Sequence, residues 1–139
     1  MKVTFKNFNV ENIEYEKLNS RQKENFNFQK LASKLADYGF NCIRLSDDWC
    51  GADFIAYHIH GEFLKVQLKG RLTINRIYEN KDIFIAFREL DQWYLYPHDE
   101  VMSILKNNVK YARSWSVNGG YSWPRLGENL KKIMADYKI

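Results

Sequence analysis

The sequence contains few residues that interrupt secondary structure or form cross-links: its 139 residues include two cysteines, two prolines and seven glycines. Cys42 and Cys50 are too few for a disulfide framework and have no CxxC spacing, so we expect a reduced, cytoplasmic setting. The scarcity of proline and glycine, together with an aromatic content of 16%, argues against disorder outside the termini.

Long apolar runs are also missing. None approaches the roughly 20 residues that a membrane helix needs, and the beginning of the sequence does not resemble a signal peptide, so we expect no membrane association. Neither sign of charge dominates: 21 Lys and Arg against 17 Asp and Glu give a net charge of +4. This charge is compatible with a polyanionic partner without identifying one. The length favours one domain, residues 1–139, with its own apolar core.

The most informative stretch is Asp53–Arg71, which predicts a β-hairpin. Two apolar-rich runs, Phe54–Ile59 and Phe63–Leu68, flank His60-Gly61, and glycine suits the positive φ of a tight two-residue turn. In the second run, apolar and polar residues alternate, so one face of the predicted strand is apolar and the other carries Lys65, Gln67 and Lys69. Because the start of one strand lies beside the end of its antiparallel partner, we expect Asp53, Gln67 and Lys69 to meet.

The rest of the chain reads as helices and strands with two long connections. Before the hairpin we expect a short strand Val3–Phe5, a helix Ser20–Tyr38 capped by Asn19 or Ser20 and ended by Gly39, a strand Phe40–Leu45 and a loop Ser46–Ala52. After it we expect a connection Gly70–Lys81, strands Asp82–Phe87 and Trp93–Tyr96, a helix Pro97–Lys106, a connection Asn107–Pro124 and a helix Arg125–Tyr137. This order predicts an α/β domain around a mixed sheet flanked by helices.

A second acid is conspicuous on the first helix. Glu24 shares its apolar stripe with Phe28, Leu31 and Leu35, where a carboxylate is costly unless it is paired, hydrogen-bonded or metal-bound. Alternatively, Glu24 is a first-turn acid that favours the helix dipole. Asp53 also has an alternative explanation, because aspartate is common in turns. Gln67 and Lys69 can likewise belong to the solvent-exposed face of a strand.

Taken together, Glu24, Asp53, Gln67 and Lys69 define one candidate catalytic site of two carboxylates, an amide oxygen and an ammonium. Hard divalent cations such as Mg²⁺ or Mn²⁺ favour oxygen ligands of this kind. A neighbouring lysine can orient or deprotonate the attacking water and offset the charge that develops on a phosphate.

This arrangement resembles the PD-(D/E)XK nuclease superfamily, which has a restriction endonuclease-like fold of αβββαβ order. The resemblance covers a core of about residues 20–106, with an aromatic loop and a C-terminal helix in 107–139. It implies that Asp53 is the metal-binding acid, Lys69 the catalytic lysine, Leu68 the donor of a backbone carbonyl to the metal and Glu24 the helix carboxylate. Ala52 departs from the proline of the family pattern, and Gln67 makes a QxK variant that contributes an oxygen without charge.

Several cations are candidate nucleic-acid contacts. Lys65, Arg71 and Arg76 lie on or just after the second hairpin strand, where a phosphate backbone can run, although a solvated basic face explains them equally. Arg113 belongs to a stretch that continues through Trp115 to Trp123, which can stack on bases or pack against the last helix.

The sequence therefore predicts a metal-dependent nuclease that hydrolyses DNA, with RNA not excluded as a substrate. Because a double-strand cut requires two sites, a homodimer or higher oligomer is expected. Two alternatives stay open. One is a catalytically inactive member of the same fold that binds nucleic acid or a protein, and the other is an interaction module in which the aromatic loop is a protein interface.

Overall fold

The computed structural model describes residues 3–5, 8–107 and 109–139. The chain divides into two compact units, Met1–Lys30 and Leu31–Ile139, and their boundary falls within helix α1 (Ser20–Ala36).

The first unit contains the antiparallel strands β1 (Val3–Phe5) and β2 (Phe8–Val10), the 3-10 helix η1 (Tyr15–Lys17) and the beginning of α1. Asn19 and Gln22 form a reciprocal cap, in which each backbone N–H donates to the other side chain at 2.9 Å. This pair satisfies two of the N–H groups that a helix start leaves unpaired. The predicted strand at Val3–Phe5 and the predicted cap at Asn19 are both confirmed.

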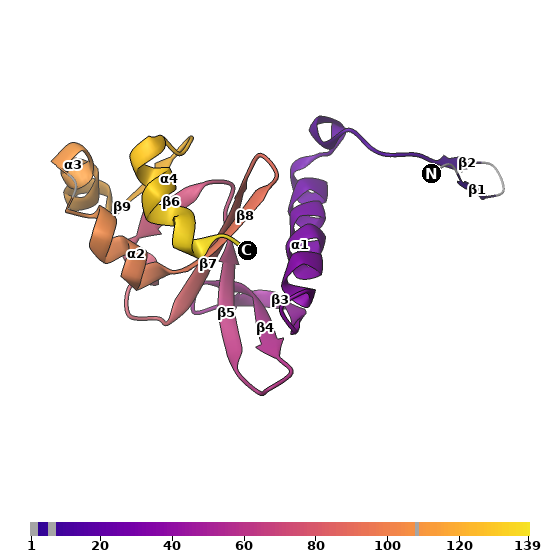
Figure 1. Cartoon of the computed structure of the whole chain (residues 1–139), viewed down its shortest axis with the longest axis horizontal. Coiled ribbons are helices and arrows are strands. Elements are labelled where there is room, and N and C mark those ends of the chain that lie inside the picture. The colour runs from indigo at the N-terminus through magenta and orange to yellow at the C-terminus, as the bar shows by residue number, and fades with distance from the viewer. Residues whose placement is uncertain (1–2, 6–7, 108) are drawn as a thin grey trace. The chain divides into compact units, whose positions relative to one another are not determined.

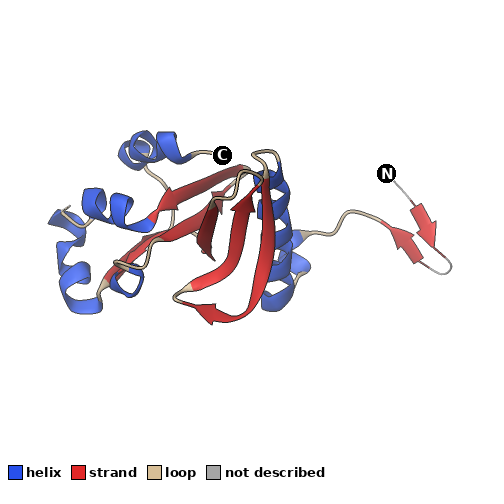
Figure 2. Cartoon of the chain, turned by 90° about the horizontal axis from the view of Figure 1, so that it is seen from below, coloured by secondary structure: helices blue, strands red, loops and turns tan. Residues whose placement is uncertain are grey.

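The second unit is built on a five-stranded mixed sheet (Figures 1 and 2). Its strands, in spatial order, are β3 (Phe40–Trp49), β4 (Ala52–His58), β5 (Phe63–Leu68), β7 (Ile83–Glu89) and β8 (Gln92–Pro97). The β5–β7 pair is parallel and the other pairs are antiparallel. The predicted mixed α/β fold is confirmed.

The edges of the predicted helices and turns need small corrections. Helix α1 ends at Ala36, before the expected Tyr38, although Gly39 adopts the positive φ of +84° that a helix stop favours. The hairpin turn is longer than predicted, because the N–H of His58 donates to the carbonyl of Glu62 and residues 59–61 form the loop. Gly61 lies in that loop with φ of +105°.

The predicted loop Ser46–Ala52 is wrong over most of its length. Strand β3 continues to Trp49, and its pairing with β4 shifts register between Arg44 and Trp49. An edge strand tolerates this irregularity, which lets polar turn-forming residues remain in a strand.

Both predicted connections contain regular structure. Residues 70–81 hold strand β6 (Leu72–Asn75) and the 3-10 helix η2 (Arg76–Tyr78), and residues 107–124 hold helix α3 (Val109–Asn118) and strand β9 (Gly120–Trp123). Strands β6 and β9 pair antiparallel with each other as a separate two-stranded sheet. We call β6 and β9 together the ribbon.

The apolar core lies between one face of the sheet and the helices α2 (His98–Leu105) and α4 (Glu128–Met134), the latter followed by the 3-10 helix η3 (Ala135–Tyr137). Pro97 is the N-cap of α2, which confirms that helix. The ribbon contributes buried Leu72, Ile74 and Trp123 to this core. Trp123 therefore packs in the interior, in line with the packing alternative for the aromatic stretch. Among the described residues, no helix has the length and apolar character needed to cross a membrane.

Candidate functional site

The register of the β4–β5 hairpin brings Asp53 next to Gln67. Phe54 pairs with Val66, and continuing this pairing by one residue sets Asp53 opposite Gln67. Residues opposite each other in an antiparallel pair project to the same face. The Asp53 carboxylate also accepts a hydrogen bond at Oδ2 from the backbone N–H of Leu68, with an N···O distance of 2.9 Å. The acid at the start of β4 is thus fixed against the end of β5.

Lys69 follows β5 on the face of Gln67, because side chains two positions apart on a strand share a face. Its backbone N–H donates to the carbonyl of Ala86 at 2.8 Å, which extends the pairing of β5 with β7. Its Nζ lies 5.4 Å from the ring centroid of Tyr78, a buried residue of η2. This is cation–π range, so backbone and side chain are both held in place.

Electrostatics distinguish Asp53 from an ordinary surface acid. Burial raises the pKa of Asp53 above its usual value, and the Leu68 N–H and the positive charge of Lys69 offset part of this increase. The charge of Asp48 raises the Asp53 pKa further and that of Arg44 lowers it. Ionised Asp53 is therefore strained electrostatically, a condition that a bound cation relieves.

Asp48 is a second acid near Asp53 that the sequence analysis did not select. Its Oδ1 accepts a hydrogen bond of 2.6 Å from the N–H of Gly51, which adopts φ of +90° in the turn before β4. A Cβ at Gly51 would lie 3.0 Å from the Tyr78 ring, so the turn packs closely on the residue that also contacts Lys69. The turn-forming sequence signals the hydrogen bond of Asp48 but not its electrostatic effect on Asp53.

Glu24 lies on the part of α1 that belongs to the first unit, and its side chain is exposed. Its assignment as a metal ligand stays a prediction. The same holds for the carbonyl of Leu68, whose N–H is the group observed in contact with Asp53.

The donor set around Asp53 suits a hard cation. Asp53 contributes a carboxylate, Gln67 an amide oxygen on the same face, and Asp48 a second negative charge nearby. Mg²⁺ in proteins is commonly bound through one or two carboxylates, with water and substrate phosphate completing the shell. Across the described ranges, no cluster of three or more His, Cys, Asp or Glu side chains has the geometry of a metal site.

The predicted nucleic-acid contacts differ in how they are held. Lys65 is half-buried, donates from Nζ to the carbonyl of Lys81, and lies 5.7 Å from the ring centroid of Trp49. Arg71, Arg76 and Arg113 are exposed. The guanidinium of Arg76 lies 5.2 Å from the ring centroid of Trp115. Lys65 thus has two contacts within the fold and is half-buried, whereas the three arginines are exposed.

No protein-family model and no curated protein matches this chain. Among solved structures, it is similar to a bacterial homing endonuclease, with 16% identity, 79% of this chain and 78% of that chain covered, and a TM-score of 0.49. It is also similar to a Holliday junction resolvase of the archaeal hyperthermophile Archaeoglobus fulgidus, with 15% identity, 50% and 74% coverage and a TM-score of 0.40. Because both TM-scores are below 0.5, the candidate site rests on its own geometry.

Proposed function

We propose that this protein is a metal-dependent nuclease that hydrolyses DNA phosphodiester bonds at the β4–β5 hairpin. The observation that carries the proposal is the hydrogen bond from the Leu68 N–H to the Asp53 carboxylate. This bond holds the Asp53 carboxylate against the end of β5, whose register sets Gln67 opposite Asp53 and Lys69 two residues further on. The sequence pattern of these residues resembles the PD-(D/E)XK superfamily in its QxK form. The proposal therefore includes a restriction endonuclease-like fold.

Each residue has a distinct role in this proposal. Asp53 and Gln67 would hold a Mg²⁺ or Mn²⁺ ion through side-chain oxygens, with the Leu68 carbonyl as a further ligand. A bound ion would supply Lewis-acid polarisation of the scissile phosphate. Lys69, held over Tyr78, orients the attacking water and offsets the negative charge that develops on the phosphate.

The substrate assignment rests on charge. The chain carries a net charge of +4, and exposed Arg71 and Arg76 follow the strand that bears Gln67. Cations of this kind bind a phosphate backbone without reading its sequence. The proposal includes Lys65 and Arg113 as further contacts, a homodimer for double-strand cleavage, and a cytoplasmic location, with which the free thiols of Cys42 and Cys50 are compatible.

The test is a cleavage assay on supercoiled plasmid, single-stranded DNA and single-stranded RNA, with Mg²⁺, Mn²⁺ or EDTA. We expect metal-dependent DNA nicking that Lys69→Ala reduces by at least about 100-fold, because the variant removes a positioned cation at the reacting phosphate. Lys132→Ala is the matched control, since Lys132 is an exposed lysine of α4 outside the site.

The outcomes separate the competing functions. Cleavage that survives Lys69→Ala at full rate contradicts the mechanism and indicates a contaminating nuclease. DNA binding without cleavage under either metal assigns the chain to the inactive, nucleic-acid-binding alternative. Cleavage confined to RNA supports the hairpin as the catalytic site and contradicts DNA as the substrate.

A further inference from the structure

The ribbon has one buried face and one polar face. Register pairs Thr73 with Ser122 and Asn75 with Gly120, and these residues alternate with the buried ones that reach the core. Polar side chains thus gather on the face that points away from the core, in the two stretches that sequence analysis treated as connections.

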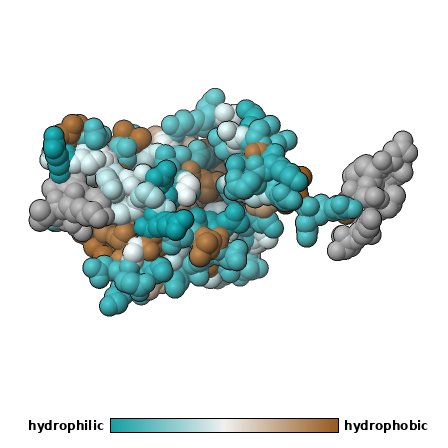
Figure 3. All heavy atoms as spheres, turned by 90° about the horizontal axis from the view of Figure 1, so that it is seen from above, coloured by the Kyte–Doolittle hydropathy of each residue, from teal (hydrophilic) through white to brown (hydrophobic). Residues whose placement is uncertain are grey.

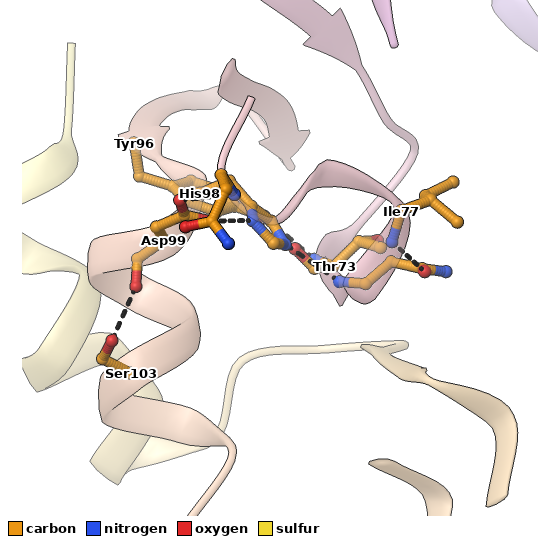
Figure 4. Close-up of polar contacts among 8 residues, drawn as sticks. Thr73, Ile77, Tyr96, His98, Asp99 and Ser103 are labelled. Atoms are coloured by element: carbon orange, nitrogen blue, oxygen red, sulfur yellow. Dashed lines mark hydrogen bonds and ion pairs between the residues drawn. The ribbon is translucent and has the colours of Figure 1, made fainter. Parts of the chain in front are cut away.

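Side chains of β8 and α2 fix the backbone of the ribbon (Figure 4). The Tyr96 hydroxyl donates to the Thr73 carbonyl at 2.6 Å and accepts from the Thr73 N–H at 3.0 Å. Fully buried His98 accepts at Nε2 from the Asn75 N–H at 2.9 Å, while its Nδ1 lies 2.9 Å from Asp99 Oδ1. Because the main chain of β6 is held at two successive outward positions, its polar face is preorganised.

Helix α3 turns this face into a groove. The Ser114 hydroxyl donates to the Gly120 carbonyl at 2.9 Å, and Asn118 donates to Ser114 at 3.4 Å. The groove has a volume of about 380 Å³, and its polar lining consists of Thr73, Asn75, Ser114, Asn118, Tyr121 and Ser122. Gly120 is required at its floor, since a Cβ there would lie 2.8 Å from the Ile74 carbonyl oxygen.

The chemistry of the lining favours base edges over phosphates. Its side-chain amides and hydroxyls carry no net charge, and no acid or base lines the groove among the described residues. Amides and hydroxyls are the groups that pair with the donors and acceptors of base edges. A cation for the flanking phosphate lies beside the groove: Arg76 follows β6 directly, donates its backbone N–H to the Gly119 carbonyl at 2.7 Å, and stacks on Trp115.

One short segment joins the groove to the hairpin site. Strand β6 begins just after Lys69, and η2 continues from β6 to Tyr78, whose ring lies under the Lys69 ammonium. The same segment therefore contacts the candidate catalytic lysine at one end and lines the groove in its middle. In the view of Figure 3, hydrophilic residues cover most of the described surface and apolar residues form separate patches.

We propose that the groove between the ribbon and α3 reads base edges of a DNA duplex whose backbone is bound at the β4–β5 site. The proposal rests on the nuclease function above. Asn118 of α3 and Ser122 of β9 are the reading residues, because they bring an amide and a hydroxyl to the groove lining from two different elements, and Arg76 is the adjoining phosphate contact.

The test is a selection from duplexes with a randomised segment, followed by binding and cleavage measurements on the enriched and unselected duplexes. Wild-type protein is expected to enrich a preferred sequence. The double variant Asn118→Ala/Ser122→Ala should lose that preference by about tenfold or more, while it still nicks unselected duplexes, because only base contacts are removed. Ser116→Ala/Asn129→Ala is the matched control: both residues are exposed and outside the groove lining. Thermal unfolding verifies that each variant is folded.

Arg76→Ala gives a contrasting signature. It should weaken binding to all duplexes alike and reduce the slope of log affinity against log salt by about one, as the loss of a phosphate contact does.

The outcomes keep the two proposals apart. A double variant that retains the wild-type preference, or wild-type protein that cleaves without any preference, overturns the groove proposal and leaves the nuclease proposal intact. A uniform loss of affinity in the double variant also overturns base reading. Wild-type protein that neither binds nor cleaves any duplex overturns the nuclease proposal itself.

Discussion

The hairpin β4–β5 and the ribbon β6–β9 are both antiparallel strand pairs, but they are specified in different ways. The hairpin strands are neighbours in sequence. Backbone hydrogen bonds hold them together at the turn, and the bond between Asp53 and the Leu68 N–H holds them together at the other end. The ribbon strands come from residues 72–75 and 120–123, and Tyr96 of β8 and His98 of α2 fix the first of them. The reactive groups thus lie on locally encoded structure, whereas the groove depends on long-range contacts. Substitutions should therefore affect the two regions separately.

The largest expected effect is on the ribbon. Tyr96→Phe removes the hydroxyl that both donates to and accepts from Thr73, and leaves two partly buried backbone groups without that partner. We expect a loss of about 1–3 kcal/mol in the free energy of unfolding. Chemical denaturation measures it, and faster hydrogen exchange of the Thr73 amide localises it to β6.

Tyr94→Phe is the control for Tyr96→Phe, because Tyr94 lies on the same strand and also packs in the core. Its effect should be clearly smaller. Equal losses for the two variants would mean that the hydroxyl of Tyr96 does not anchor the ribbon.

The sequence predicted the hairpin because its signals are local. Alternation in residues 63–68 and Gly61 in the turn specify strands and reversal, and the antiparallel register then brings Asp53 to Gln67 without further information. The mixed sheet follows from the order of such elements.

The ribbon and the role of Asp48 could not be predicted in this way. Leu72–Asn75 is a short strand whose partner lies far along the chain. Gly119 follows helix α3 with a positive φ and Gly120 is a close-packed strand residue, but two adjacent glycines in a sequence indicate a loop. His98 had no spacing that marked it, since its partners are the backbone of Asn75 and the adjacent Asp99. Asp48 acts on Asp53 through space, because the pairing of Trp49 with Ala52 brings the two acids together across the β3–β4 turn, and the sequence analysis had assigned this stretch to a loop.

A smaller, pH-dependent effect should also be confined to the ribbon. Burial lowers the pKa of His98 below its ordinary value of 6.5, and the hydrogen bond and charge of Asp99 and the charge of Glu79 offset part of this decrease. The unfolded chain therefore takes up a proton near pH 6.5 while the folded chain does not. The free energy of unfolding should fall as the pH is lowered from about 6.5 through the folded pKa of His98.

Denaturation from pH 8 to pH 5 measures this dependence, with His98→Gln as the comparison. The glutamine carbonyl oxygen can accept the Asn75 N–H but does not titrate, so the variant should lose less stability on acidification than the wild type. The comparison removes every pH-dependent contribution that the two proteins share. Parallel profiles for wild type and variant would show that His98 does not couple ribbon stability to pH.

The smallest expected change in stability is at the hairpin, and it has the opposite sign. Because burial raises the pKa of Asp53, the folded chain binds a proton at this carboxyl more readily than the unfolded chain. Ionised Asp53 therefore costs stability, and this cost develops as the pH rises from about 3.8 through the folded pKa. Asp53→Asn keeps an oxygen that accepts the Leu68 N–H but removes the charge. At pH 7 without metal, the variant should be as stable as the wild type or slightly more stable.

Plasmid cleavage and stabilisation by Mg²⁺ show whether Asp53→Asn affects the proposed site as well as stability. Asp53→Asn should abolish plasmid nicking, and it should also remove the increase in thermal stability that Mg²⁺ gives the wild type, because ligand binding to the folded state stabilises it. Asp91→Asn, in the exposed turn between β7 and β8, is the control and should leave both properties unchanged. If Asp53→Asn instead destabilises the chain at pH 7 without metal, the carboxylate serves the fold more than the reaction. The hairpin would then be, like the ribbon, a region whose polar contacts are structural, and the catalytic assignment of Asp53 would fail.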